Sequence, residues 1–451
     1  MQLTVGQLLE AVNGTLLYGN RESTFRYVCT DSRQAMTTEL FIPLVGEVHD
    51  GHQYLKNAVA NGAAGFLTQT EAVPENAGFA VLVEDTTKAL GQLASYVRDQ
   101  LDVTVIGITG SVGKTTTRQF VASVVSQLGK TLATSGNFNN HIGLPLTILK
   151  AEGDEKYLVL EMGMNHLGEI SYLSRIAKPD IGIITMIGTS HIEYLGSREN
   201  ILKAKMEITD GMNDKGILLL HGDNDLLSQA STEKQVYYFG ETNARYPYRV
   251  VSEDGVFWMD EATYEIPITG IHNIQNASAA VLLGKLLGAT PKEIQSGLSA
   301  FQSVGLRQKT ETLGEIQVIL DCYNASADSD KAALRVLGKT KGQRKIAVLG
   351  PIGELGEFQS SILQEVGEAV QENQIDKLVC VEEASHWIQI GAMDAGMNPE
   401  DIVFCPNREE FIQKTYNLWA AGDVVLFKAS RAYRLEELYE NLKQFLSDNK
   451  E

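Results

Sequence analysis

The sequence predicts an α/β protein with two or three domains. Its 451 residues exceed the roughly 100–200 that one domain usually holds. Short strands rich in Val and Ile alternate with helices through the middle of the chain, a pattern typical of parallel sheets with crossover helices. The alternation begins again after about residue 310, which indicates a second open α/β unit.

The elements follow from the apolar periodicity and from Gly and Pro at the boundaries. The first segment, up to about residue 85, mixes short elements: a strand at 40–46, a helix at 54–65 and a strand at 66–68. The middle segment has expected strands at 104–109, 156–163 and 180–188, and expected helices at 86–101, 115–129, 169–177 and 271–288. The last segment has expected strands at 345–350, 377–382 and 423–430, with helices at 362–374 and 408–422 between them.

Composition excludes some classes of function. The net charge of -19 argues against a nucleic-acid-binding protein, although a local positive pocket would still accept an anionic substrate. The four cysteines form no CxxC motif and fit a reducing compartment. The first residues lack the pattern of a signal peptide, and the apolar stretches are far shorter than the roughly 18 residues that span a membrane. We therefore expect a soluble cytoplasmic protein.

The stretch from Gly107 to Thr117 (GITGSVGKTTT) lies between a predicted strand and a predicted helix, which is the context of a phosphate-binding loop. Glycines let backbone N–H groups face phosphate oxygens, and the start of a helix favours negative charge. Lys114 would reach the β- and γ-phosphates, and the Thr115 hydroxyl would bind Mg²⁺. The strict GxxxxGK[ST] form needs glycine at Ile108, so the loop fits a shorter GxxGxGKT-like pattern. Motors, switches, kinases and ligases all use such loops.

Two polar side chains, Glu161 and His191, follow predicted strands at the edge where ligands bind in open α/β sheets. Mg²⁺ prefers oxygen ligands, so the carboxylate suits it better than the imidazole. On these local grounds a solvated Glu161 and a structural or substrate-binding His191 remain alternatives. Lys205, fourteen residues after His191, has the local pattern of a surface lysine on a polar helix face.

An ordered series of stretches resembles the Mur ligase family. The series is TDSRQAMTTELFIPLVGEVHDGH, GITGSVGKTTT, TSGNFNNHIGLPLTIL, EMGMNHLGEI, HIEYLGSRENILKAKMEI, GIHNIQNASAA, DCYNASADSD, VLGPIGELGE and KASRAYRLEEL. The third stretch resembles one branch of the family, the branch that adds a dipeptide, more than it resembles the other branches. The series covers most of the chain.

The resemblance implies a reaction in peptidoglycan precursor synthesis. ATP would phosphorylate the C-terminal carboxylate of UDP-N-acetylmuramoyl-tripeptide. The amine of D-alanyl-D-alanine would then attack the acyl phosphate, giving UDP-N-acetylmuramoyl-pentapeptide, ADP and phosphate. The resemblance also implies three domains: a uridine-nucleotide domain at 1–84, a central ATP-binding domain at 85–307, and a Rossmann-like domain at 308–451 for the amine substrate. A monomer without nucleic-acid or membrane partners is expected.

The resemblance assigns roles to residues one by one. Catalytic roles fall to Lys114, His191 and Lys205, the last as a carbamate, because an ammonium offers no lone pair to a metal and a carbamate is carboxylate-like. ATP contacts are expected from Gly110, Gly113, Lys114, Thr115, Thr116, Asn276, Arg307 and Asp321. Two Mg²⁺ sites would draw on Thr115, Glu161 and His191. Substrate contacts are expected from Ser32, Arg33, Asn139, Asn140, Asn165, His166, Tyr323, Asn324, Lys428, Ser430 and Arg431.

Several positions depart from the family's patterns, mostly in the C-terminal half. Where the family shows YNANPxSM, this chain has Ser326, Ala327 and Asp330; LGDM loses its acid at Pro351, and KGSR becomes KASR. In the central segment His141 stands where many relatives carry an acid.

Two alternatives follow from these departures. One is a Mur-type ligase with another amine acceptor, and the other is a non-catalytic nucleotide-binding paralogue. A paralogue would be expected to lose Lys114, Glu161, His191 or Lys205, and all four are present. Whether the third residue of the peptide is lysine or diaminopimelate is not readable from the sequence.

Overall fold

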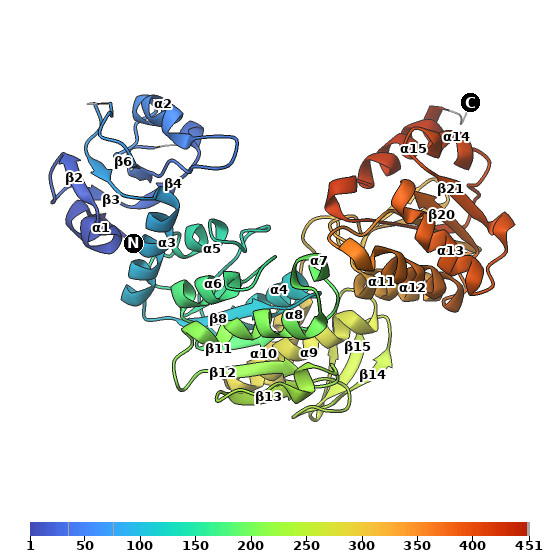
Figure 1. The fold of residues 1–451 in the computed structure, drawn as a ribbon. Coiled ribbons are helices and arrows are strands. Elements are labelled where there is room, and N and C mark those ends of the chain that lie inside the picture. Colours follow the sequence, from blue (N-terminus) through green and yellow to red (C-terminus); the bar gives the residue numbers. More distant parts are fainter. Residues whose placement is uncertain (35, 75, 449–451) are drawn as a thin grey trace.

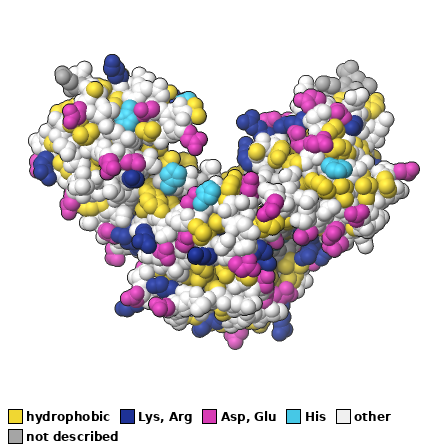
Figure 2. All heavy atoms as spheres, viewed as in Figure 1, with side chains coloured by type: hydrophobic (Ala, Val, Ile, Leu, Met, Phe, Trp, Pro, Cys, Tyr) yellow, Lys and Arg dark blue, Asp and Glu magenta, His cyan; other side chains and the backbone are white. Residues whose placement is uncertain are grey.

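The computed structural model describes residues 1–34, 36–74 and 76–448, and it forms three lobes, each around its own sheet (Figure 1). The central lobe lies between and below the other two, and the space-filling view shows a wide hollow above it (Figure 2). Charged side chains of both signs are interspersed over this face (Figure 2). Within the described residues, no helix combines the length and apolar character needed to cross a bilayer.

The N-terminal lobe has a five-stranded sheet with one helix on each face. In order across the sheet, its strands are β2 (Thr15–Tyr18), β7 (Ala80–Leu82), β6 (Gly65–Thr68), β5 (Glu39–Phe41) and β4 (Tyr27–Cys29). The neighbours Leu40 and Phe41 face opposite sides, because side chains alternate along a strand. Leu40 packs with α1 (Val5–Val12), and Phe41 packs with α2 (Leu55–Ala60).

Two details of this lobe concern its edges. The strand expected at 40–46 is shorter, because Pro43 has no N–H to donate and its carbonyl accepts the Thr86 hydroxyl at 2.5 Å. A two-stranded ladder, β1 (Leu3–Thr4) with β3 (Thr24–Phe25), lies beside α1.

The central lobe holds a fully parallel six-stranded sheet, as expected from the alternation of strands and helices. In order across the sheet, its strands are β13 (Gln235–Phe239), β12 (Ile217–His221), β11 (Ile181–Ile184), β8 (Thr104–Thr109), β10 (Tyr157–Glu161) and β9 (Thr131–Ala133). One face is covered by α4 (Lys114–Val125), α9 (Ile271–Leu286) and α10 (Pro291–Ser299). The other is covered by α3 (Thr86–Gln100), α5 (Gly143–Ile148), α6 (Glu169–Ala177) and α8 (Arg198–Met206).

One sheet of this lobe was not expected from the sequence. The strands β14 (Tyr248–Ser252), β15 (Val256–Met259) and β16 (Ala262–Glu265) form an antiparallel meander. Its buried aromatic residues join the same core as α9, so the segment adds a cover to that helix rather than another strand to the parallel sheet.

The C-terminal lobe has a six-stranded sheet in which only the edge strand β17 is antiparallel. In order across the sheet, its strands are β17 (Lys309–Leu313), β18 (Ile316–Leu320), β22 (Asp423–Lys428), β19 (Arg344–Leu349), β20 (Lys377–Val381) and β21 (Ile402–Cys405). One face is covered by α11 (Ala327–Lys339), α12 (Gln359–Glu372) and α13 (His386–Asp394), and the other by α14 (Glu410–Thr415) and α15 (Glu436–Asp448).

The helix expected at 408–422 ends early, at Thr415. The Arg344 guanidinium donates to the Leu418 carbonyl at 2.7 Å, and the Asp423 carboxylate accepts from the Ala420 N–H at 2.8 Å. These side chains satisfy backbone groups that a longer helix would have used, so the chain turns into β22 instead.

The two open sheets determine where a ligand binds. The carboxyl ends of β8, β10 and β11 lie at one edge of the central sheet, and the residues after β18 and β22 lie across from them. Loops at the carboxyl ends of parallel strands form the usual ligand crevice of open α/β sheets.

Candidate active site

The phosphate loop joins β8 to α4. Gly113 has φ +85°, and a Cβ there would lie 2.4 Å from Asn276 Oδ1, so both backbone and space require glycine. The Lys114 ammonium folds back onto its own loop, donating to the carbonyls of Gly110 at 2.7 Å and Ser111 at 3.3 Å. Burial lowers the pKa of Lys114. The loop thus holds its lysine where an incoming phosphate would recruit it.

A cavity of about 520 Å³ opens above this loop, with walls from the central and C-terminal lobes. Most residues singled out in the sequence line it: Gly113, Lys114, Thr115, Thr116, Asn139, Asn140, Glu161, Asn165, His191, Asn276, Arg307, Asp321, Tyr323, Asn324 and Lys428. Residues far apart in the sequence, and predicted from separate stretches, are therefore brought to one place.

Arg307 connects the two walls. It lies just before β17, and its guanidinium donates to the Thr115 hydroxyl at 3.1 Å. The same guanidinium lies over the Tyr323 ring, 4.0 Å from the centroid. A cation therefore already rests against the hydroxyl for which the sequence predicts a metal ligand.

Glu161 ends β10 and is 2% exposed. One carboxylate oxygen accepts from Asn139 Nδ2 at 2.9 Å, and the other makes no hydrogen bond and lies 3.6 Å from the Arg118 guanidinium. Arg118 is itself 1% exposed. Buried polar atoms normally have hydrogen-bond partners, so the carboxylate oxygen that lacks one is an available ligand atom. This donor fits Mg²⁺, which takes oxygen ligands.

His191 starts α7 (Ile192–Leu195) with φ +66°. Its Nδ1 lies 2.5 Å from a carboxylate oxygen of Glu354. Burial lowers the pKa of His191 despite that carboxylate, and the contact lowers the pKa of Glu354. A neutral imidazole beside an ionised carboxylate is the result, and a neutral imidazole is the form that binds metals.

Lys205 on α8 is 1% exposed, and within the described residues its ammonium group makes no hydrogen bond or ion pair. The interpretation as a surface lysine is therefore wrong. Burial, with Lys114 nearby, brings the pKa of Lys205 well below its ordinary value. A buried lysine that is readily neutral is a reactive amine rather than a fixed cation.

On the C-terminal wall, the Lys428 ammonium lies in a buried polar cluster. It donates to Asp321 Oδ2 at 2.6 Å and to the Asn324 carbonyl at 3.1 Å, and lies 3.7 Å from Asp330. Asp330 is fully buried, and burial raises its pKa to about 7. Asp330, which departs from the family pattern, therefore belongs to the same buried cluster as Asp321 and Lys428, two residues predicted for the site.

Some predicted residues lie away from the cavity. Ser32 and Arg33 lie in the N-terminal lobe, where Arg33 is paired with Asp31. His166 contacts the Tyr194 ring, 4.9 Å between centroids, instead of lining the cavity. The remaining members of this set are Gly110, which begins the phosphate loop, Ser430, whose hydroxyl accepts the Gly353 N–H, and Arg431, which pairs with Glu436.

Three residues of the site were missed by the sequence reasoning: Arg118, Asp328 and Glu354. Arg118 follows Lys114 by four residues on the apolar face of α4, and a charge at an inward position was the signal available. Asp328 lines the cavity with one carboxylate oxygen buried and unpartnered, and no local sequence signal marked it. Glu354 reaches the site only through the contact between lobes.

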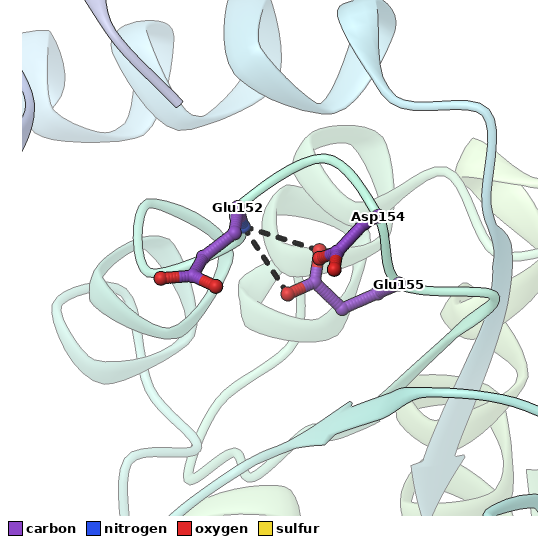
Figure 3. Close-up of side chains that lie close together, drawn as sticks. All are labelled: Glu152, Asp154 and Glu155. Carbon is purple, nitrogen blue, oxygen red and sulfur yellow. Dashed lines mark hydrogen bonds between the residues drawn. The ribbon is translucent and has the colours of Figure 1, made fainter.

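A group of carboxylates elsewhere has metal-like spacing and a different explanation (Figure 3). Glu152, Asp154 and Glu155 lie in the loop before β10, at the amino end of that strand. Glu155 accepts the backbone N–H groups of Glu152 and Gly153, and the Lys130 ammonium contacts all three carboxylates. Lys130 and the backbone N–H groups already serve as partners of these carboxylates, so their spacing does not by itself indicate a metal site.

A phosphate loop that faces a second open α/β sheet across a shared cavity is the architecture of a nucleotide-dependent enzyme. Residues 108–284 match the Mur ligase middle domain, and residues 306–431 match the Mur ligase, glutamate ligase domain. The chain belongs to the Mur ligase family.

Individual relatives show which members of the family the chain is similar to along nearly its whole length. The UDP-N-acetylmuramoyl-tripeptide–D-alanyl-D-alanine ligase of Bacillus subtilis is 38% identical, over 97% of this chain and 98% of the relative. The enzyme of that name from Escherichia coli is 33% identical, over 98% and 99%. Among solved structures, MurF from Acinetobacter baumannii superimposes with a TM-score of 0.89 at 30% identity, covering 98% of this chain and 99% of that one. MurF from Thermotoga maritima in complex with ADP has a TM-score of 0.81 at 27% identity, covering 94% and 98%.

Proposed function

We propose that this chain adds D-alanyl-D-alanine to UDP-N-acetylmuramoyl-tripeptide at the expense of ATP. The observation that carries the proposal is the cavity, which places the phosphate loop and Glu161 opposite Asn324 and Lys428 of another lobe. Relatives named for this reaction align along nearly the whole chain. Addition of the dipeptide turns the tripeptide into the pentapeptide.

The reaction brings two anions together, the tripeptide carboxylate and the ATP triphosphate. Their repulsion is large in a site with little water. Lys114 would exchange the Gly110 carbonyl for phosphate oxygens, and the N-terminus of α4 would add its partial positive charge. Arg307, already beside Thr115, would contribute a further cation. One carboxylate oxygen would leave with the phosphate as the amine nitrogen takes its place on the carbonyl carbon.

We infer that Mg²⁺ is held by Thr115, Glu161 and His191, because these side chains line one cavity and the second oxygen of Glu161 has no hydrogen-bond partner. When bound, the ion would supply charge neutralisation at the phosphates. Asn139 and Arg118 would keep the Glu161 carboxylate turned toward it.

We further propose that Lys205 carries a carbamate. The neutral amine is the form that adds CO₂, and burial beside Lys114 favours that form. The amine nitrogen bonds to the carbon of CO₂ and loses one proton to solvent, so an unpaired buried amine becomes an anion next to Lys114, which restores charge balance in the cluster. A carbamate could orient Lys114 or ligate metal.

The lobes suggest a division of labour. We propose that residues 1–84 bind the uridine nucleotide through Ser32 and Arg33, that 85–307 bind ATP, and that 308–451 position the amine. All four cysteines are free in the structure, which fits the reducing cytoplasm that we propose for this reaction.

Two of the departures in the C-terminal half, Ser326 and Ala327, do not call for another acceptor. Ser326 is the N-cap of α11, and its hydroxyl accepts the Ser329 N–H at 3.3 Å. Asn and Ser are equivalent N-caps, and the first helical position, Ala327 here, is the one that commonly takes proline. The exchange of Asn-Pro for Ser-Ala therefore keeps the start of the helix.

A phosphate-release assay with all three substrates tests the proposal. We expect release that requires the tripeptide nucleotide, ATP and the dipeptide together, and a product heavier by one dipeptide less water. With ¹⁸O in the terminal carboxylate, one labelled oxygen should appear in the released phosphate. Release without the dipeptide product, or equal use of other amines, would contradict it.

A further inference from the structure

One contact between lobes reaches directly into the cluster above the phosphate loop. Glu354, in the C-terminal lobe, places a carboxylate oxygen 2.5 Å from Nδ1 of His191. Its backbone carbonyl accepts the Glu193 N–H at 3.2 Å. Two residues later, a Cβ on Gly356 would lie 3.0 Å from the Glu193 side chain. The loop around Glu354 is therefore packed against the start of α7.

Both partners of this contact have strained backbones. His191 has φ +66° and Glu354 has φ +61°, in the left-handed region that residues other than glycine rarely adopt. Such strain persists where the surrounding structure holds it, and it gathers at functional sites. Here the two strained residues belong to different lobes and meet each other, so the strain serves one contact.

The contact gives the two nitrogens of the His191 ring different roles. Nδ1 is buried against Glu354, and the ring lines the cavity with Lys114 and Glu161. A carboxylate behind an imidazole fixes the tautomer with the proton on Nδ1 and leaves the lone pair of Nε2 for a ligand. Nε2 is therefore the ring nitrogen left for the cavity.

We propose that Glu354 is a positioning residue that acts through His191. It fixes the ring's orientation and tautomer for a divalent cation bound with the nucleotide. Because Glu354 belongs to the C-terminal lobe, the cation site is complete only when that lobe is docked as it is here. This inference rests on the proposed function of the cavity and adds the link between lobe docking and the ion.

The first test needs no metal and no substrate. The full-length chain is labelled with ¹⁵N-histidine, and the ring signals of His191 are identified by their loss in His191→Asn. We expect the Nδ1–H tautomer in the wild type, a mixture of tautomers in Glu354→Ala, and partial retention in Glu354→Gln, whose amide oxygen still accepts. Glu357→Ala is the control, because Glu357 is an exposed carboxylate of the same loop. An unchanged His191 pattern in Glu354→Ala would overturn the proposal.

The second test measures Mn²⁺ binding to the chain with a non-hydrolysable ATP analogue. Loss of such an outer partner typically weakens metal binding by about 10- to 100-fold. We expect about tenfold weaker Mn²⁺ binding in Glu354→Ala, a smaller loss in Glu354→Gln, and none in Glu357→Ala. Equal Mn²⁺ affinity in Glu354→Ala and Glu357→Ala would overturn it. A wild type that shows the ring contact but fails in the ligase assay would contradict the proposed function alone.

Discussion

Charged side chains cluster in two places in the central lobe, and only one of these clusters contains buried polar atoms without hydrogen-bond partners. In the loop of Glu152, Asp154 and Glu155 (Figure 3), the Lys130 ammonium contacts all three carboxylates, and backbone N–H groups donate to Glu155. Around the phosphate loop, buried polar atoms lack hydrogen bonds: of the eleven such side-chain atoms in the described residues, four line the cavity besides Nδ1 of His191, which faces Glu354. Their residues are Ser111, Glu161, Arg307 and Asp328. Unsatisfied buried groups, more than density of charge, mark the place where a ligand binds.

The sharpest way to test this contrast is to remove one lysine from each cluster. Lys114→Met should lower kcat/KM by roughly 10³-fold, because a donor aimed at transition-state charge is lost. Lys130→Met should leave the rate within about twofold, since an exposed ion-pair network contributes little. Steady-state phosphate release measures both variants. Similar losses in the two would erase the distinction between the clusters.

A second comparison uses two lysines on α8. Lys205→Ala should lower activity by roughly 10²-fold, since a group that orients the phosphate cluster is removed. Acetate or formate should restore part of the rate if a carboxylate-like group is what is missing. Lys203→Ala, on the exposed side of the same helix, should be active with and without these anions. Full activity of Lys205→Ala would show that the carbamate is not needed.

The buried pair of Arg118 and Glu161 tests the role of unpaired charge. Arg118→Met removes one partner of a buried pair, which typically costs about 3–5 kcal/mol of stability. Adding Glu161→Gln removes the remaining charge, so the double variant should have a higher Tm than Arg118→Met alone. Calorimetry measures the three proteins. A double variant less stable than either single one would contradict this explanation of the contact.

Asp330 predicts a smaller effect that depends on pH. The folded-state pKa, about 7, lies above the ordinary value of 3.8, so its favourable contribution is present below about pH 4 and is lost as pH rises through 7. At 1.4 kcal/mol per pKa unit, the loss is at most roughly 4 kcal/mol. Relative to Asp330→Asn, the wild type should therefore lose stability between pH 4 and pH 8. Denaturant unfolding at several pH values checks this, and parallel curves for the two proteins would refute it.

The fold was largely predictable because parallel sheets have a strong local signature. The Val- and Ile-rich strands that became β8, β10 and β11 are buried on both faces, so the sequence shows them as continuous apolar runs. The meander of β14 to β16 is harder to read, because its strands are only four or five residues long and exposed positions alternate with buried ones, as at Trp258 beside Phe257. The premature end of α14 depends on Arg344, more than sixty residues away, and no local pattern encodes it.

The residues of the site also fall into those that the sequence predicts and those that depend on tertiary contacts. Lys114, Thr115 and Glu161 follow from position at strand ends and in one loop, and the structure gathers them in the cavity. Lys205 could be assigned only by resemblance, since its burial is a tertiary property. Glu354 could not be predicted, because its role depends on a contact with His191, which belongs to another lobe and lies some 160 residues earlier in the sequence.

The cavity that takes its walls from two lobes also has a consequence for drug design. A small molecule that touches both Thr116 and Asn324 would hold the central and C-terminal lobes together. Its release would then require its contacts with both walls to break. Unrelated ATPases share only the phosphate-loop wall, so selectivity would come from the half of the compound that rests on the other lobe.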